Sequence, residues 1–476
     1  MRTRTIAAVA VLFTGLMISG CSSNMSSNTP PVQGQIPVSM TMRDTPPAGV
    51  TVLAFEVHVT GATLQPADTS KADVSLVSGN LEIELRHLET ESALLRTSGA
   101  PSGTYNSLTL TFANPEMTIQ NGTAATITVG GKSCAVGAIC QFQPALNQAT
   151  VKISASPFPL MLSSGTALSL DIDFDVDASL QNDLSVTPTV SVTPTISRAR
   201  GEMAEADDLA GQVTAVGMNQ FTLQPLFGPA LTILVDNNTR FEDFDDAGCA
   251  ANNFTCVQMN QIVSVDLGVM DDNDESSTSN ASLSLTAKKV ELKDHFQKEL
   301  EGKVASVNAA SGQFQLVVHD EAEALQGVAL GDVLTITVNT GATFDVDQDG
   351  LTVPSGLQFL SISDMIAGQS VEINPAGITV SGSGIAVTTD RVRLHRTQVT
   401  GSVMSVTGAN FTLGNLSSLF TGAGVTAIQV QTSSQTQFAD VSGVASLTTN
   451  DTVSVGGLLF NSTPAPVLLA EKVRKH

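Results

Sequence analysis

Short runs of alternating apolar and polar residues dominate the chain from Ile36 onward, as in 52–59 and 105–112. Glycine, asparagine, aspartate and proline separate these runs. A period of two is typical of half-buried β-strands, and clustered turn residues mark their ends. Helical periodicity is nearly absent. Many short strands with frequent turns predict an all-β protein built from sandwiches or barrels.

The first module is expected over 36–197 as a β-sandwich. Its late stretch 171–177 reads Asp-Ile-Asp-Phe-Asp-Val-Asp. In a strand, this alternation places every aspartate on one face and every apolar residue on the other. The acidic face is either solvated or holds a cation, and the sequence leaves both interpretations open.

Three later segments share one pattern, Gly-x-Val-x-x-Val followed by Phe-x-Leu, beginning at Gly211, Gly302 and Gly401. Each continues with a Thr-Phe or Thr-x-Phe strand and then a valine-rich strand. After a linker at 198–208, we therefore expect three repeats, which span 209–294, 298–396 and 398–476. Five or six strands per repeat favour small closed barrels of the oligonucleotide/oligosaccharide-binding (OB) type. The glycine in the first strand would allow the tight coiling that closure needs.

The amino terminus predicts export and lipidation. Arg2 and Arg4 precede a short apolar stretch, and Ile18-Ser-Gly-Cys21 is similar to the lipobox of bacterial lipoproteins. We expect 1–20 to be a signal peptide, Cys21 to be lipidated, and 21–35 to be a flexible tether. An ordinary signal peptide with a chance cysteine is the alternative. Because no aspartate follows Cys21, the outer membrane is favoured over the inner membrane.

The formal net charge of −23 makes phosphate backbones repulsive, so nucleic acid is not an expected partner. The membrane, reached through the lipid, is the expected partner, and we expect a monomer. A protein or small-ligand partner stays open.

Four further cysteines form two close pairs, Cys134 with Cys140 and Cys249 with Cys256. Beyond the cytoplasm such pairs favour disulfides, with zinc ligation as the alternative. No histidine lies beside either pair to complete a zinc site.

Two bacterial families resemble these modules. The first module resembles domain of unknown function 4382, through its opening at 38–48, the Pro-Ser-Gly-Thr-Tyr turn at 101–105 and Leu-Asp-Ile-Asp-Phe at 170–174. It is also similar to the transthyretin-type or carboxypeptidase-regulatory sandwich. The three repeats resemble domain of unknown function 5666, through the Gly-x-Val…Phe-x-Leu…Thr-x-Phe pattern. Neither family brings a known reaction, so the resemblance implies only architecture and an envelope location.

The most specific chemical motif is Asp345-Val-Asp347-Gln-Asp349-Gly350 in the second repeat. Oxygen ligands at alternate positions before a glycine are typical of calcium loops. The twelfth position, where a bidentate glutamate belongs, is Gly356, so a full Ca²⁺ site needs another carboxylate. An acidic hairpin loop without an ion is the alternative.

Enzyme motifs such as Gly-x-Ser-x-Gly and His-Glu-x-x-His are absent from the sequence, and the six histidines show no paired spacing. The chain has no tryptophan and one tyrosine, which disfavours sugar recognition. We therefore expect a non-enzymatic, envelope-anchored protein with a structural, adhesive or presentation role. The alternative is a cation- or ligand-binding accessory protein, and a hydrolase is a weaker third hypothesis.

Overall fold

The computed structural model describes residues 35–45, 51–197, 201–225, 228–245, 248–271, 282–293, 300–321, 328–348, 350–381 and 384–476. The expected signal peptide, Cys21 and Asp349 lie outside these residues. Nearly every regular element in the described part is a β-strand, as predicted. None of the described helices is long and apolar enough to cross a membrane.

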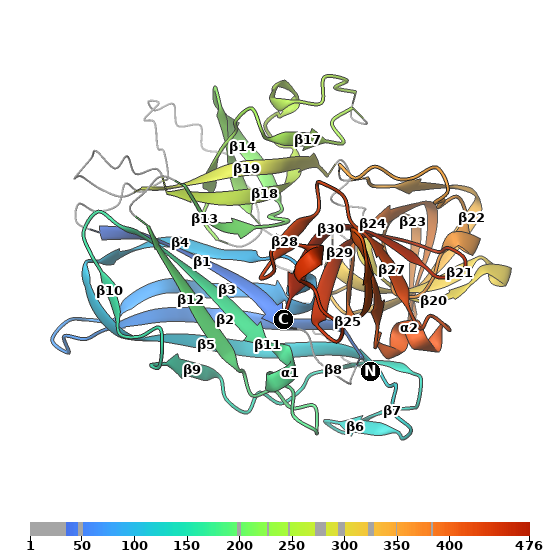
Figure 1. The fold of residues 1–476 in the computed structure, drawn as a ribbon, viewed down its shortest axis with the longest axis horizontal. Coiled ribbons are helices and arrows are strands. Elements are labelled where there is room, and N and C mark those ends of the chain that lie inside the picture. The colour runs from blue at the N-terminus through green and yellow to red at the C-terminus, as the bar shows by residue number, and fades with distance from the viewer. Residues whose placement is uncertain are drawn as a thin grey trace, which may run out of the picture.

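Most of the strands described in 35–197 form a sandwich of two sheets (Figure 1), and the short strands at 127–129 and 132–134 form a separate hairpin. Its elements are β1 (Gln35–Thr45), β2 (Thr51–Pro66), β3 (Val74–Glu84), the 3-10 helix η1 (Leu85–Glu89), β4 (Ala93–Pro101), β5 (Gly103–Gln120), β6 (Ile127–Val129), β7 (Lys132–Cys134), β8 (Ile139–Phe142), β9 (Thr150–Ile153), β10 (Leu160–Leu162), β11 (Ala167–Asp175), α1 (Val176–Ser179) and β12 (Val190–Ser197). One sheet has the order β12-β11-β1-β4 and the other β10-β5-β2-β3, with β8 and β9 also paired to β5. Phe174 meets Phe55 and Phe112 edge-on between the sheets, at ring separations of 6.1 and 5.4 Å. This aromatic contact fixes the centre of the sandwich core.

Three further segments each close into a small barrel. Barrel 1 contains β14 (Gly211–Val216), β15 (Gln220–Pro225), β16 (Leu231–Leu234), β17 (Arg240–Glu242), η2 (Phe254–Cys256), β18 (Ile262–Asp271) and β19 (Leu283–Leu292). Barrel 2 contains β20 (Leu300–Asn308), η3 (Ala309–Ser311), β21 (Gln313–Glu321), β22 (Val333–Val346), η4 (Ile362–Asp364), β23 (Ser370–Ser381) and β24 (Gly384–His395). Barrel 3 contains β25 (Thr397–Thr407), β26 (Asn410–Gly414), α2 (Ser418–Gly422), β27 (Ile428–Gln431), β28 (Gln437–Ala439), η5 (Val444–Ser446), β29 (Thr452–Phe460) and β30 (Val467–Lys475).

The three barrels share one strand order. Their rings are β14-β15-β16-β19-β18, β20-β21-β22-β24-β23 and β25-β26-β27-β30-β29, and in each the fifth strand named pairs back to the first. In each ring the third and fourth strands named are parallel, and the other pairs are antiparallel. This topology agrees with the expected OB-like barrel.

The repeated glycine occupies the same tight position in each barrel. A Cβ atom at Gly211, Gly302 or Gly401 would lie no more than 2.7 Å from a backbone oxygen of the neighbouring strand. No side chain fits at that distance. The three glycines therefore permit the close strand approach that the sequence pattern predicts.

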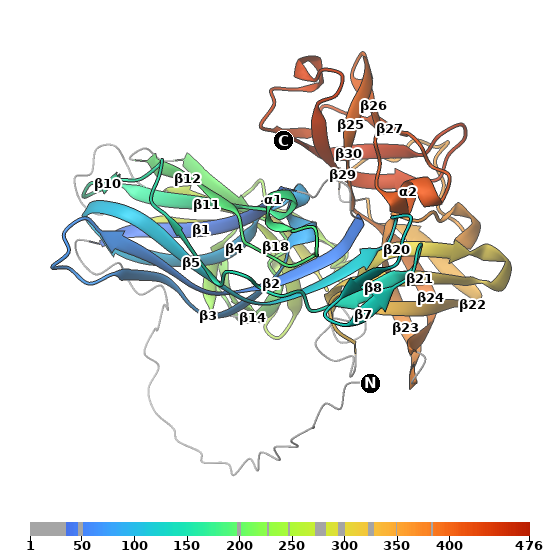
Figure 2. The ribbon, with the colours of Figure 1, turned by 90° about the horizontal axis from the view of Figure 1, so that it is seen from below.

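The four modules pack into one assembly. Barrel 1 lies above the sandwich in Figure 1, and Figure 2 shows barrels 2 and 3 side by side at the sandwich's end. Leu53 of the sandwich, Val317 of barrel 2 and Leu419 of barrel 3 share one buried apolar cluster. The chain therefore folds back so that its last barrel meets its first domain.

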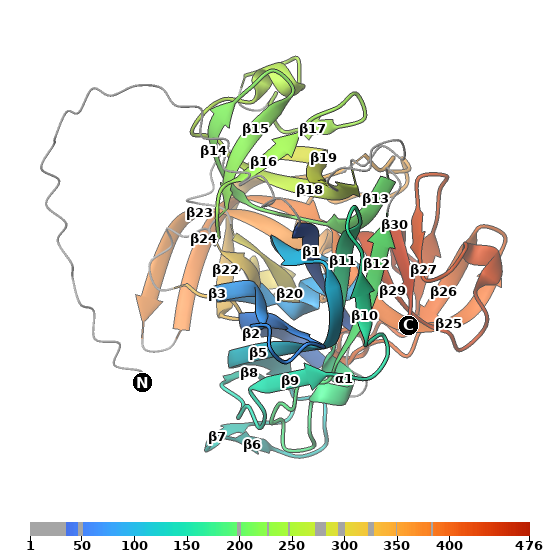
Figure 3. The same ribbon diagram turned by 90° about the vertical axis from the view of Figure 1, so that its left-hand side faces the viewer.

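Two expectations need correction. The predicted linker 198–208 contains strand β13 (Gly201–Ala206), which pairs with β18 because β18 extends beyond the ring of barrel 1. Figure 3 shows β13 beside β18. The acidic strand ends at Asp175, which caps helix α1, so Asp177 lies in the helix and not in the strand.

Candidate metal centre

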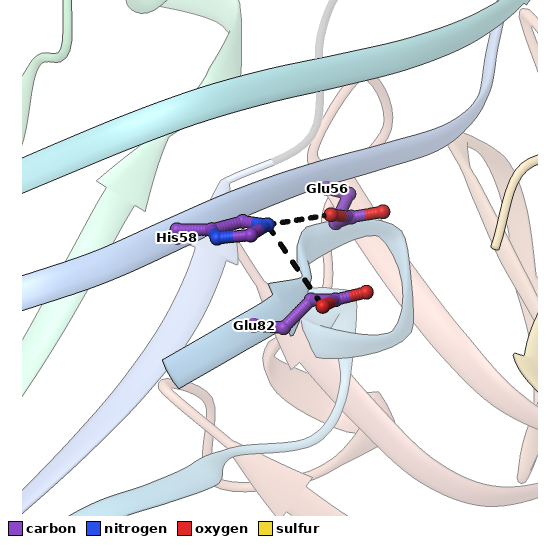
Figure 4. Close-up of side chains that lie close together, drawn as sticks. All are labelled: Glu56, His58 and Glu82. Atoms are coloured by element: carbon purple, nitrogen blue, oxygen red, sulfur yellow. Dashed lines mark hydrogen bonds and ion pairs between the residues drawn. The ribbon is translucent and has the colours of Figure 1, made fainter. Parts of the chain in front are cut away.

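A histidine and two glutamates meet on the outer face of the sandwich. Glu56 and His58 lie two residues apart on β2, and Glu82 lies on β3 directly opposite His58 (Figure 4). The intervening Val57 is fully buried in the core. Strand alternation therefore holds the three polar side chains on one face while β2 stays anchored by its apolar face.

The imidazole of His58 lies between the two carboxylates. Its Nε2 is 2.9 Å from Glu56 Oε1 and 3.8 Å from Glu82 Oε2. Its Nδ1 is 2.9 Å from the amide oxygen of Asn80. Because an amide oxygen only accepts, Nδ1 carries the hydrogen, and Nε2 is the atom that faces the carboxylates.

Burial and like charge perturb this cluster. The Glu56, His58 and Glu82 side chains are only 12%, 14% and 25% exposed. Burial, followed by the charge of Glu82, raises the pKa of Glu56 to about 7, and the charge of Glu116 on β5 adds to this rise. Burial lowers the pKa of His58, but its contacts with Glu56 and Asn80 outweigh this and raise it overall. In the described part of the chain, His58 is the only cationic side chain within ion-pair distance of Glu56 or Glu82.

A second cluster joins barrels 1 and 2. The ligand atoms of Glu291, Asp347 and His395 lie within 4.8 Å of one another. Both ring nitrogens of His395 already face carboxylates, Nδ1 at 3.1 Å from Glu301 and Nε2 at 3.2 Å from Asp347. Lys293 pairs with Glu291 at 2.5 Å. Burial lowers the pKa of His395, but Glu301 and Asp347 raise it well above its usual value. This cluster is an ionic bridge whose positive charges come from the protein itself.

The predicted calcium residues have protein partners. Asp345 lies at the end of β22, where its carboxylate is 2.8 Å from Arg391 Nε and 3.4 Å from Arg393 Nε. Asp347 faces His395, and Asp349 lies outside the described residues. The calcium site stays a prediction, and an ion there would have to compete with these ion pairs.

The aspartates on the acidic face of β11 form ion pairs with an arginine of the neighbouring strand. Arg43 of β1 lies 3.3 Å from Asp171 and 3.8 Å from Asp173. The apolar residues that alternate with these aspartates, Ile172 and Phe174, are fully buried. The alternation is therefore as predicted for these residues, and an arginine occupies the place considered for a cation.

Both expected cysteine pairs are at disulfide distance. The S–S distance is 2.02 Å for Cys134–Cys140 and 2.06 Å for Cys249–Cys256. Cys134 and Cys256 are fully buried. The pairs therefore join short loops to the sandwich and to barrel 1.

Sequence reasoning missed the Glu56–His58–Glu82 cluster. Glu-Val-His in a strand places two ligand types on one face, and this was the available signal. Glu82 is brought in only by the register between β2 and β3, which the sequence does not specify.

Residues 33–189 match the domain of unknown function DUF4382. Residues 210–274 and 400–474 match the domain of unknown function DUF5666. These matches cover most of the sandwich, part of barrel 1 and most of barrel 3. They agree with the resemblance expected for the first module and for the first and third repeats, and the resemblance of the second repeat, 298–396, stays a prediction. No curated protein matches the chain.

Proposed function

We propose that this chain is a lipid-anchored protein of the bacterial cell envelope whose sandwich and barrels form one rigid, non-enzymatic head with a structural, adhesive or presentation role. In this proposal Cys21 carries the lipid, 21–35 is the tether, and the outer membrane is the membrane that holds it. Barrel 2 is proposed as a divergent third copy of the DUF5666 repeat, because it has the same ring order and the same tight glycine.

The docking of barrel 3 onto the sandwich carries this proposal. Arg474 of β30 is buried, and its Nη1 donates to the carbonyl oxygens of Leu88, Glu89 and Glu91 at 3.2, 3.3 and 3.5 Å. Arg396 adds a pair with Glu91 at 2.8 Å. Hydrogen bonds to charged groups are stronger than those between neutral groups, so this junction holds barrel 3 against the sandwich. A head locked in this way favours a structural role over one that depends on independent modules.

Membrane fractionation and mass spectrometry of Cys21 test the anchoring. In the producing cells, the wild-type chain should stay with washed membranes and carry a lipid on the thiol of Cys21. Cys21→Ser should carry no lipid, whereas the neighbouring Ser22→Ala should keep it. Wild-type protein without lipid on Cys21, or wild-type protein that washes off the membranes, would contradict the proposal.

The Glu56–His58–Glu82 cluster favours a second candidate role, cation binding by an accessory protein. Its geometry supports this role more directly than the 345–350 loop does, because two of the loop's carboxylates are already paired with basic side chains.

A further inference from the structure

We propose that Glu56, His58 and Glu82 bind a first-row divalent transition-metal ion such as Zn²⁺. This inference is independent of the lipid anchor. It rests on three observations: the spacing of the ligand atoms, the orientation of the imidazole, and the charge around the site.

The spacing suits a small ion. A tetrahedral Zn²⁺ with bonds of about 2.0–2.2 Å holds its ligand atoms about 3.3–3.6 Å apart. The distances from His58 Nε2 to the two carboxylate oxygens, 2.9 and 3.8 Å, bracket that range. All three ligand atoms lie within 4.8 Å of one another, so small side-chain movements complete the geometry.

The imidazole is oriented as a metal ligand would be. Metal-binding histidines usually donate their other ring N–H to a fixed acceptor, which sets the tautomer and the ring plane. The amide oxygen of Asn80 accepts from His58 Nδ1 at 2.9 Å. The lone pair of Nε2 in the neutral ring then points between Glu56 and Glu82.

The negative charge of the carboxylates at the site favours a bound cation. Glu56 and Glu82 place two carboxylates beside the His58 imidazole, and Glu116 on β5 lies directly across from Glu56. In the ionic bridge between barrels 1 and 2, by contrast, Lys293 neutralises part of the acidic charge. A divalent ion at the sandwich site would offset the mutual repulsion of these carboxylates.

The ligand types select the class of ion. Calcium takes six to eight oxygen ligands, and magnesium keeps most of its water. Imidazole nitrogen with carboxylate oxygen suits zinc and its first-row neighbours, and three protein ligands leave a coordination position for water. We therefore expect Zn²⁺ to bind much more tightly than Ca²⁺ or Mg²⁺.

Isothermal titration of the full-length chain in detergent with Zn²⁺, Ca²⁺ and Mg²⁺ tests the proposal. We expect one Zn²⁺ per chain, and His58→Ala and Glu82→Gln should each weaken that binding by about 100-fold or more. Asn80→Ala leaves all three ligands in place and should weaken it by about 10–100-fold. His476→Gln, at a histidine bonded to Ser454 and remote in sequence, should bind like wild type.

Circular dichroism confirms that each variant is folded, and if His58→Ala fails this check, Glu82→Gln and Asn80→Ala decide the question. Absence of Zn²⁺ binding by the wild type overturns the proposal. It is equally overturned if folded Glu82→Gln and Asn80→Ala bind as the wild type does, or if Ca²⁺ binds as tightly as Zn²⁺.

Discussion

Replacing Phe460 by alanine should weaken the contact between barrels 2 and 3. Phe460 is 1% exposed, and it belongs to the core cluster of barrel 2 although its strand, β29, is part of barrel 3. The adjacent Leu459 points the other way, into barrel 3's own core. Phenylalanine-to-alanine changes in packed cores cost about 3–5 kcal/mol, and we expect the lower half of this range because the contact lies between two barrels that can adjust.

Hydrogen exchange monitored by mass spectrometry shows which strands lose stability in the Phe460→Ala variant. A loss of about 3 kcal/mol accelerates exchange more than 100-fold for amides that open with the contact. In Phe460→Ala, this acceleration should include β20 to β24 of barrel 2. Phe411→Ala is the matched control, because Phe411 is 2% exposed and packs within barrel 3. Its acceleration should centre on barrel 3. If exchange in barrel 2 were unchanged by Phe460→Ala, the shared core would be refuted.

Three further variants test the barrels and their junctions. Gly302→Ala should lower the free energy of unfolding by about 1–3 kcal/mol in chemical denaturation, because a Cβ there overlaps a backbone oxygen. Gly356→Ala should be neutral, because no atom lies within 4 Å of the added Cβ. Equal stabilities of the two variants would contradict the close strand approach. His395→Gln should destabilise the chain most below pH 6.5. The pKa of His395 is raised in the folded chain, so its protonation stabilises the fold fully below pH 6.5, and this stabilisation fades as pH rises through the raised pKa. A destabilisation that grew with pH would contradict a raised pKa. Arg474→Met should cost about 2–4 kcal/mol, because three carbonyl oxygens lose their donor. Lys475→Met, at a partly exposed ion pair with Asp451, should cost much less. A similar cost for both would show that the buried junction is unimportant.

Local patterns in the sequence predicted much of the fold. The alternation of Ile172 and Phe174 with aspartates correctly assigned the buried face of β11. The repeated glycines correctly marked a close strand approach in each barrel. These features succeed because strand period and glycine sterics act between near neighbours.

Features that depend on pairing between distant segments were not predicted. Strand β13 looked like an acidic linker, because its pairing with β18 is tertiary. The run Leu458-Leu459-Phe460 is apolar at every position, a pattern of strands covered on both faces, but the sequence does not say that barrel 2 covers it. The metal cluster required the register between β2 and β3, and the loop at 345–350 resembled a calcium site because its basic partners, Arg391 and Arg393, lie on another strand.

Small-angle X-ray scattering of the chain from Ser22 onward tests most directly whether the four modules form one rigid head. The account predicts a scattering curve that matches the docked arrangement, with one compact distance distribution and a radius of gyration not far above the roughly 22 Å expected for a compact chain of about 450 residues. An extended distribution with separate peaks for distances within and between modules would contradict it, because the barrels would then move independently of the sandwich.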